Sequence, residues 1–303
     1  MPELPEVEHL RRSLDPWVVG GRLGRVSVRR RSVVSFASDE LRRDLDAALL
    51  ANATIVDTHR HGKQMAFEAL DGRVLVVQLG MTGSVTIERG AHPRGMDAKH
   101  RHVIWEFTPS HTAVRATGAD VAKPWRLVFR DPRRFGGLTA YPSFAALKEA
   151  WLALGHDAAN PSGSLLKICI EGSKRPIKSA LLDQAVIAGL GNIYADEALF
   201  ASQIHPLRSC NSLKNKDFHR LTAHIRRILG HAINAGGSTL RDYRDAFGQP
   251  GDAVQSHKVY GRAGQPCLRC GTRLEGVRLG GRTTVFCPSC QGLGSDLSTK
   301  PSG

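Results

Sequence analysis

Met1-Pro2-Glu3-Leu4-Pro5-Glu6-Val7-Glu8 opens the chain and places a potential secondary amine beside a carboxylate, directly before a helix. Val7, Leu10 and Leu14 recur at helical spacing, and we expect Asp15-Pro16 to end this helix. If Met1 is removed, the ring nitrogen of Pro2 has a usable lone pair. While Met1 remains, an amide bond delocalises that lone pair.

A free amine can add to an electrophilic sugar carbon and form an imine. A secondary amine forms an iminium ion, which keeps a positive charge and withdraws electrons. Glu3 could move protons as a general acid and base, and the positive end of the following helix would favour the neutral amine. Pro and Glu are also ordinary first-turn helix residues, which is the better explanation of the dipeptide taken alone.

The composition points to a polyanionic partner. Lys and Arg number 42 against 28 Asp and Glu in 303 residues, which gives a net charge of +14. No tail concentrates this charge, and 41% of the residues are hydrophobic, so we expect a folded nucleic-acid-binding protein of two domains. The acidic N-terminus does not resemble a signal peptide, and the most apolar run is too short to cross a membrane. A cytoplasmic, nucleoid-associated location is expected.

Short segments rich in β-branched and aromatic residues follow Gly20-Gly21 and predict strands. They lie at 25–34, 64–70, 73–79, 84–88, 103–107 and 126–130. This pattern indicates an all-β domain, a sandwich or flattened barrel, with the first helix packed against it. Residues 108–124 are small and polar and predict a long, mobile hairpin loop without a catalytic role.

The second half of the chain has helical periodicity. Ser143 can cap a helix over 144–154, and 160–163 is a plausible hinge. Further helices are expected after Pro176, after Asn192 and around 218–232, the last ended by Gly236-Gly237. The expected organisation is a β domain at 2–142, a helix and hinge at 143–163, a helical module at 164–257, a zinc module at 258–291 and a disordered tail at 292–303.

The strongest local signal is the pair of motifs Cys267-x-x-Cys270 and Cys287-x-x-Cys290. In a reducing compartment such pairs indicate a metal site rather than disulfides. Four thiolates complete the tetrahedral coordination of one Zn²⁺, so the zinc should be structural. Gly280-Gly281 predicts a two-residue hairpin turn that places Arg282 at or next to the tip of a β-ribbon, a shape suited to a DNA groove.

Other motifs are ambiguous when each is considered alone. Met81 lies in a glycine-bounded turn, and Asp131-Pro132-Arg133-Arg134-Phe135-Gly136 places two arginines and an aromatic ring on another turn. A protein that extrudes a base could use them to fill the vacated space, although core packing is the default interpretation of Met81 and Phe135. Gly189-Leu190-Gly191-Asn192 could bind phosphate, but a tight interhelical turn is the simpler interpretation. Lys99-His100-Arg101-His102 is a possible phosphate patch. Lys63 and Lys178 are by default solvated surface lysines.

Taken together and in order, these motifs resemble those of the formamidopyrimidine-DNA glycosylase and endonuclease VIII family over residues 1–291. The matching segments are Met1–Glu8, Gly62-Lys63, Leu79–Gly83, Asp131–Gly136, Gly191–Ala195, Val259–Arg262 and the four cysteines. The resemblance implies an α+β protein of two domains, an N-terminal β-sandwich with an N-terminal helix and a C-terminal helix–two-turns–helix module with a four-cysteine zinc-finger β-hairpin. It also implies that DNA is bound between the domains.

The resemblance further implies a bifunctional enzyme that excises oxidised purines from duplex DNA and cleaves abasic sites by β,δ-elimination. Pro2 would attack the deoxyribose C1′, Glu3 would donate a proton, and Lys63 would serve elimination. Met81, Arg133 and Phe135 would fill the vacated space, and Arg133 would face the orphaned cytosine. Lys178, Asn192, Tyr260 and Arg282 would bind phosphates, and Arg282 would also belong to the catalytic residues. His100 and Arg134 would be further DNA contacts. The protein is expected to be a monomer.

Some positions depart from the family pattern. Gln78 replaces a frequent His, Gln64-Met65 replaces the usual Tyr-Leu, and the 108–124 segment is longer than typical. None of these changes removes a catalytic group, but they leave the substrate range open. Two alternatives remain: an endonuclease VIII-type enzyme for oxidised pyrimidines, and a non-catalytic zinc protein that binds DNA on the same scaffold.

Overall fold

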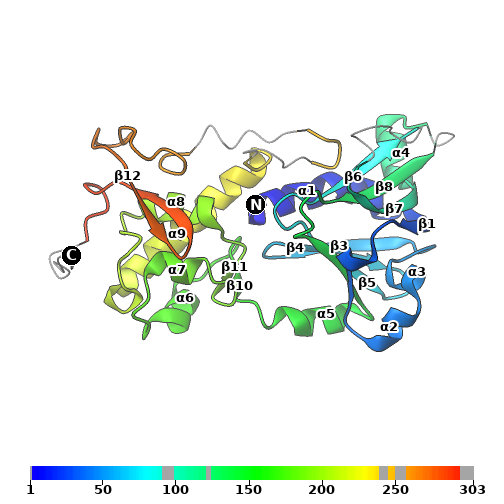
Figure 1. The fold of residues 1–303 in the computed structure, drawn as a ribbon, viewed down its shortest axis with the longest axis horizontal. Coiled ribbons are helices and arrows are strands. Elements are labelled where there is room, and N and C mark those ends of the chain that lie inside the picture. Colours follow the sequence, from blue (N-terminus) through cyan, green and yellow to red (C-terminus); the bar gives the residue numbers. More distant parts are fainter. Residues whose placement is uncertain (1, 91–98, 121–123, 239–244, 250–256, 294–303) are drawn as a thin grey trace. The chain divides into compact units, whose positions relative to one another are not determined.

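The computed structural model describes residues 2–90, 99–120, 124–238, 245–249 and 257–293. The chain divides into two compact units (Figure 1). The first unit comprises Met1–Ala153 and Ala232–Val254, and the second comprises Leu154–His231 and Gln255–Gly303. The tail predicted at 292–303 lies outside the described residues from 294 onward, as does most of the loop predicted at 244–256.

Two sheets form the sandwich of the first unit. The strands are β1 (Arg22–Val28), β2 (Val34–Phe36), β3 (Ile55–His61), β4 (Gln64–Ala69), β5 (Val74–Gln78), β6 (Ser84–Arg89), β7 (Arg101–Thr108), β8 (Trp125–Arg130) and β9 (Gly137–Tyr141). One sheet has the order β1-β7-β8-β6 and the other β2-β9-β5-β4-β3. Five of the six predicted strands correspond to β4, β5, β6, β7 and β8, whereas the strand predicted at 25–34 ends at Val28 and is followed by a 3-10 turn at Arg31–Val33. Strands β2, β3 and β9 were not predicted. The β-sandwich expected from the family resemblance is therefore confirmed.

Helix α1 (Leu4–Val18) contacts β3 and β4 through a fully buried stripe. Its members are Leu4, Val7, Leu10, Leu14 and Val18. The prediction that Asp15-Pro16 ends the helix is wrong, because Pro16 lies inside it. Residues outside the helix stabilise its last turn. The backbone N–H of Ser110 donates to the carbonyl of Trp17 at 2.9 Å, and Val18 is buried in the core. These contacts offset the hydrogen bond that proline cannot donate.

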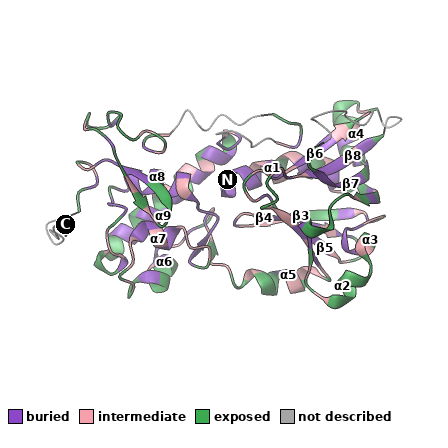
Figure 2. Ribbon diagram, in the orientation of Figure 1, coloured by how far each residue is buried: buried purple, intermediate pink, exposed green. Residues whose placement is uncertain are grey.

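The other helices that the structure describes in this unit are short. Helix α5 (Phe144–Trp151), capped by Ser143 as predicted, packs on the five-stranded sheet through Leu147. Helices α2 (Asp39–Arg43), which has no buried residue, and α3 (Leu45–Ala48) follow β2 after the short 3-10 turn Arg31–Val33 (Figure 2). The structureless loop predicted at 108–124 is corrected by α4 (His111–Thr117), whose N-terminus Ser110 caps through its side chain. Residues 121–123 lie outside the described part.

The second unit is a helical module joined to a hairpin. It contains α6 (Gly163–Ile170), α7 (Ile177–Leu181), α8 (Asn192–Ala201), most of α9 (Asn215–Asn234), the short parallel pair β10 (His156–Asp157) and β11 (Ile187–Ala188), and the 3-10 turn Cys210–Ser212. Helix α8 buries eight consecutive residues from Ile193 to Phe200, so it is the central element of the module. The left-handed glycines Gly236 and Gly237 follow α9, as predicted.

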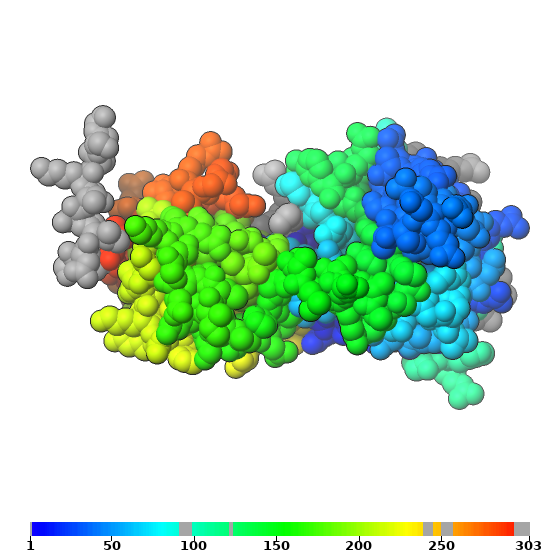
Figure 3. All heavy atoms as spheres, turned by 90° about the horizontal axis from the view of Figure 1, so that it is seen from below, coloured from blue at the N-terminus to red at the C-terminus, as the bar shows by residue number. Residues whose placement is uncertain are grey.

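The hairpin consists of β12 (Glu275–Leu279) and β13 (Arg282–Phe286). Leu279 pairs with Arg282 across Gly280-Gly281, and both glycines have positive φ, which confirms the predicted two-residue turn. Strand β13 contacts α8. In the space-filling view the orange atoms of this region stand out from the green and yellow helical module (Figure 3).

Candidate active site and zinc centre

The start of α1 is fixed by a reciprocal capping box. Glu3 is the N-cap, and its side chain accepts the backbone N–H of Glu6. The Glu6 carboxylate in turn accepts the N–H of Glu3 at 2.7 Å. Pro2 and Glu3 are both buried, and Glu3 is only 2% exposed. The carboxylate of Glu3 is therefore buried at the start of α1, and Glu3 directly follows Pro2 in the chain.

Glu6 also binds the segment that follows α9. Its second oxygen accepts the N–H of Ser238 at 2.6 Å. Gly237 has φ +79°, and a Cβ placed there would lie 3.0 Å from Cγ of Glu6. The glycine is thus needed both for its backbone conformation and for this close approach. Glu6 has no functional signal in the sequence, because its second partner lies 232 residues away.

A second network joins α1 to the turn that carries Lys63. Glu8 accepts hydrogen bonds from Arg11, from Arg12 and from Arg60, the last at 3.0 Å. Arg60 also donates to the carbonyl of Gly62 at 3.1 Å. Because Gly62 and Lys63 form the turn between β3 and β4, this network connects the helix that begins behind Pro2 and Glu3 to the Lys63 turn. The half-buried Lys63 does not match the default interpretation as a solvated lysine.

The Glu8 network should make the stability of the first unit depend on pH. Burial would raise the pKa of Glu8, but hydrogen bonds from Arg11 and Arg12 and the charge of Arg60 lower it from 4.5 to about 2. A lowered acid pKa stabilises the folded state above the unfolded pKa, and this contribution is lost as the pH falls from about 4.5 to about 2. The shift corresponds to at most about 3 kcal/mol.

We therefore expect Glu8→Gln to destabilise the first unit at pH 6, and the difference from wild type to shrink as the pH falls toward 2. All four tryptophans lie between Trp17 and Trp151, so tryptophan fluorescence during urea unfolding reports on this unit. A difference that is constant from pH 6 to pH 2 would contradict the assigned role of the Glu8 charge.

Two adjacent loops hold the residues predicted to fill the space left by an extruded base. The buried carboxylate of Asp131 accepts the N–H of Arg133 at 3.2 Å, the N–H of Gly136 at 2.7 Å and the hydroxyl of Thr82. Thr82 belongs to the Met81 turn, so Asp131 joins both loops. The backbones also touch, since a Cβ on Gly80 would lie 2.3 Å from the N of Gly136. The motif 131–136 does not by itself reveal this role of Asp131, because Thr82 lies 49 residues away.

The loop tips are exposed rather than part of the core. Phe135 is 61% and Met81 37% exposed. The guanidinium of Arg133 lies over the Phe135 ring, 4.8 Å from its centroid. The core-packing interpretation of Met81 and Phe135 is therefore wrong. These side chains are available to a ligand.

Next to these loops, His100 and Arg134 line a basic recess of about 430 Å³. Both have left-handed backbone conformations, with φ of 63° and 59°. The other lining residues are Arg29, Arg30, Arg101, His102 and Pro132. Arg29 and Arg30 were not singled out from the sequence, because only the sheet brings them close to the His100 patch.

In the second unit, Asn192 and Arg282 lie next to the same stretch of β13. Gly191 caps α8, and Asn192 occupies the first helical position. The side-chain amide of Asn192 donates to the carbonyl of Thr283 at 2.9 Å. Arg282 is exposed and immediately precedes Thr283. An exposed arginine and a helix N-terminus are thus fixed near each other.

Lys178 is completely buried, which overturns its default interpretation as a solvated lysine. Its ammonium group pairs with Asp196 at 2.6 Å and donates to the hydroxyl of Thr284 at 2.8 Å. Burial raises the pKa of Asp196 to about 6 against the opposing charge of Lys178. In this conformation Lys178 has no surface with which to contact a phosphate, and its predicted DNA contact stays a prediction.

Tyr260 lies in a segment without helix or strand, and the neighbouring acid of α8 holds that segment. The carboxylate of Glu197 accepts the backbone N–H groups of Lys258, Val259 and Tyr260 at 2.8–3.0 Å. Glu197 is 6% exposed. No sequence signal revealed this contact, since 61 to 63 residues separate the partners.

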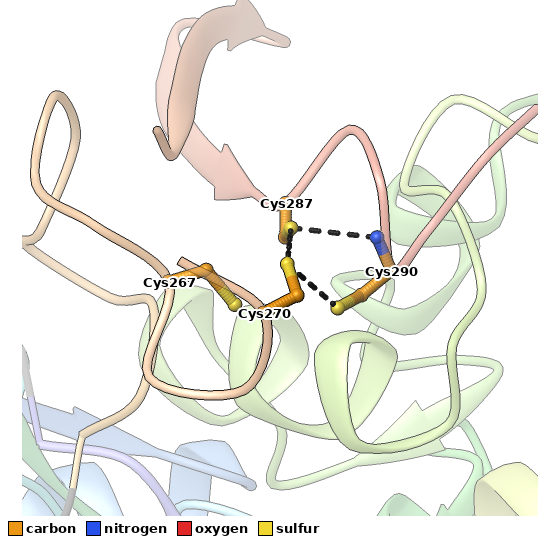
Figure 4. A group of neighbouring side chains, drawn as sticks. All are labelled: Cys267, Cys270, Cys287 and Cys290. Carbon is orange, nitrogen blue, oxygen red and sulfur yellow. Dashed lines mark hydrogen bonds between the residues drawn. The ribbon is translucent and has the colours of Figure 1, made fainter. Parts of the chain in front are cut away.

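The four cysteines converge in one site, as Figure 4 shows. The Sγ atom of Cys270 lies 3.5 Å from those of Cys287 and Cys290, and all four sulfurs lie within 4.8 Å of one another. These separations exclude disulfides, whose sulfurs are about 2.05 Å apart. They suit four thiolates around one zinc ion with Zn–S bonds of about 2.3 Å. Cys169 and Cys210 lie outside the cluster.

The chain thus consists of two sheets with a capped N-terminal helix, a helical module and a four-cysteine hairpin, and known protein families match these parts in the same order. Family models match residues 1–138 (formamidopyrimidine-DNA glycosylase N-terminal domain), 154–244 (the H2TH domain of that enzyme) and 264–292 (a zinc finger found in FPG and IleRS). Formamidopyrimidine-DNA glycosylases from Rhodopseudomonas palustris strain TIE-1 and Streptococcus pneumoniae serotype 4 are 39% and 35% identical. The matches cover 96% of this chain and 100% and 99% of those relatives.

Solved structures give the same result. A Lactococcus lactis FPG mutant bound to Fapy-dG-containing DNA superposes with a TM-score of 0.81 at 31% identity, and the match covers 96% of this chain and all of that one. A MutM complex with carbocyclic 8-oxo-G DNA gives 0.81 at 30% identity with the same coverage.

The chain belongs to the formamidopyrimidine-DNA glycosylase family. It is an enzyme of the bifunctional DNA glycosylase and abasic-site lyase class, and it carries a site for one structural zinc ion. Among the residues that the structure describes, no helix has the length and apolar character needed to cross a membrane.

Proposed function

We propose that this enzyme excises oxidised purines, 8-oxoguanine and formamidopyrimidines, from duplex DNA and then cleaves the abasic site through a Schiff base on Pro2. The observation that carries the proposal is the shared framework of its candidate groups. Glu3 caps the helix behind Pro2, and Glu8 and Arg60 connect that helix to the Lys63 turn. This shared framework supports the assignment of Pro2 as the nucleophile, Glu3 as the proton donor and Lys63 as the lysine of the elimination steps.

The first step is displacement of the damaged base at C1′. The lone pair of the Pro2 nitrogen attacks C1′, and the glycosidic bond between C1′ and the damaged base breaks. The Pro2 nitrogen loses its proton, and the departing base is protonated. Glu3 supplies the proton that opens the sugar ring at O4′, which leaves an iminium ion between Pro2 and C1′. Glu3 is buried and directly follows Pro2 in the chain, which supports this assignment.

The iminium charge then promotes strand cleavage. It acidifies the C2′ proton, whose loss expels the 3′ phosphate in β-elimination. A second elimination expels the 5′ phosphate and leaves a one-nucleotide gap with phosphates at both ends. We assign Lys63 to these eliminations. The protein is proposed to act as a monomer in the cytoplasm, on nucleoid DNA.

Exposed loop tips support a role in stabilising the extruded state. Extrusion costs a few kcal/mol, and Met81 and Phe135 can replace the lost stacking while Arg133 faces the orphaned cytosine. His100, Arg134, Asn192, Tyr260 and Arg282 are assigned to DNA contacts. The arginine–phenylalanine wedge favours the purine-type enzyme over the endonuclease VIII type.

A lesion panel combined with borohydride trapping tests the proposal. Wild-type protein should excise 8-oxoguanine opposite cytosine faster than thymine glycol, and borohydride should yield a covalent adduct that peptide mass spectrometry places on Pro2. Preference for thymine glycol would support the endonuclease VIII alternative. Absence of any adduct with bound DNA would support the non-catalytic alternative.

A further inference from the structure

Two adjacent acids of α8, Asp196 and Glu197, are nearly fully buried although neither is a candidate for DNA contact. We propose that they are positioning residues that hold the Arg282 hairpin and the Tyr260 segment in a fixed arrangement around Asn192. The inference rests on the proposed function, because it gives these three residues a common task. Two carboxylates on one helix would then set the geometry of the phosphate contacts.

Glu197 fixes the position of the Tyr260 segment. Both of its oxygens accept the N–H of Lys258, at 3.0 and 2.9 Å, and one also accepts the N–H groups of Val259 and Tyr260. Three successive N–H groups directed at one carboxylate form an anion-binding concavity. Because residues 257–261 form no helix or strand, no ladder of backbone hydrogen bonds could replace this contact.

Asp196 fixes the hairpin. One oxygen pairs with Lys178, and the other accepts the N–H of Val285 at 3.1 Å. The Lys178 ammonium also donates to Thr284 and to the carbonyl of Thr283 at 3.3 Å. The pair thereby holds three successive residues of β13, directly after Arg282. Lys178 is therefore part of the framework that holds the hairpin.

Helical spacing explains how the two acids act with Asn192. Asn192 and Asp196 are four residues apart and share one face of α8. Both contact β13, Asn192 at the carbonyl of Thr283 and Asp196 at the N–H of Val285. A substitution of Asp196 should therefore displace Arg282, and one of Glu197 should displace Tyr260, although neither acid contacts DNA itself.

The test is Glu197→Gln, which keeps the shape of the side chain but removes its charge and points an NH₂ group at backbone N–H donors. We expect the KM for an 8-oxoguanine duplex, and the Kd for an uncleavable abasic analogue, to rise about tenfold, as for loss of one charge-assisted contact. The kcat at saturating DNA should stay within about twofold, with one zinc ion still bound.

A double-mutant cycle separates positioning from general stability. If Glu197 acts through Tyr260, adding Glu197→Gln to Tyr260→Phe should raise the Kd little further, whereas independent effects would multiply. Asp217→Asn is the matched control, because Asp217 is a buried, ion-paired acid of α9 in the same unit. It should lower stability but leave the Kd and KM unchanged.

The role of Asp196 is tested by a second double-mutant cycle for the Kd. It combines Lys178→Met/Asp196→Asn, which leaves no unpaired buried charge, with Arg282→Ala. An unchanged Kd in Glu197→Gln, multiplicative effects in both cycles, or an equal rise in Asp217→Asn would overturn the inference. If wild type binds the duplex but forms no borohydride adduct, the proposed function fails, while the Kd comparisons still decide the positioning role.

Discussion

Protein that retains Met1 is expected to excise 8-oxoguanine at least about 10³-fold more slowly than the same protein after Met1 is removed. The reason is electronic: with Met1 in place, the lone pair of Pro2 belongs to an amide and cannot attack C1′. Losing the nucleophile of a catalytic unit typically costs several orders of magnitude in rate. Treating the Met1-containing protein with a methionine aminopeptidase should restore both excision and the borohydride adduct. Intact mass before and after treatment defines the two forms.

Glu3→Gln in the processed protein provides the matched comparison. It keeps the amine but removes the proton donor, so excision should fall by about 10²- to 10⁴-fold. Trapping on a duplex that already contains an abasic site should persist, because the ring-opened aldehyde of that site condenses with Pro2 with loss of water and needs no protonation of O4′. Equal activity of the Met1-containing and processed forms, or an adduct mapped to Lys63 in both, would remove Pro2 from the mechanism.

The metal site and hairpin could be predicted from sequence because their chemistry is local. The spacing of Cys267, Cys270, Cys287 and Cys290 and the turn Gly280-Gly281 constrain structure whatever surrounds them. The strands were predictable for a similar reason, since alternation and β-branched residues report directly on a pleated, half-buried surface. The zinc prediction and the turn were confirmed.

The framework around the candidate site depends on partners that no local pattern reveals. Glu6 and Ser238 are 232 residues apart, and Asp196 and Val285 are 89 apart. Tertiary contacts also overrode local rules, as at Pro16, which remains helical because the turn that contains it is held by Ser110. The groups suited to the chemistry can therefore be identified from the sequence, whereas the residues that hold those groups in position can be identified only from the structure.

Cys270→Ala is expected to release the zinc and weaken binding to damaged DNA by about 10²-fold or more, while the first unit stays folded. The buried core shared with the hairpin contains only Phe200, Val259, Cys267, Leu274, Val285 and Cys287 among the residues that the structure describes. A core this small cannot stabilise the module alone, whereas zinc binding contributes about 10–16 kcal/mol in finger peptides. Without zinc, Arg282 and Tyr260 lose their fixed positions, and two charge-assisted contacts of about 1.5–3 kcal/mol each are lost.

Cys169→Ala is the matched control, because Cys169 is exposed and lies outside the cluster. It should keep one zinc ion and wild-type affinity, which excludes a general effect of removing a thiol. Since every tryptophan lies within the first unit, an unchanged fluorescence unfolding curve for Cys270→Ala would show that this unit folds independently of the metal. Full DNA affinity in the zinc-free variant would mean that the hairpin does not contribute to binding, and loss of the tryptophan transition would mean that the units fold together.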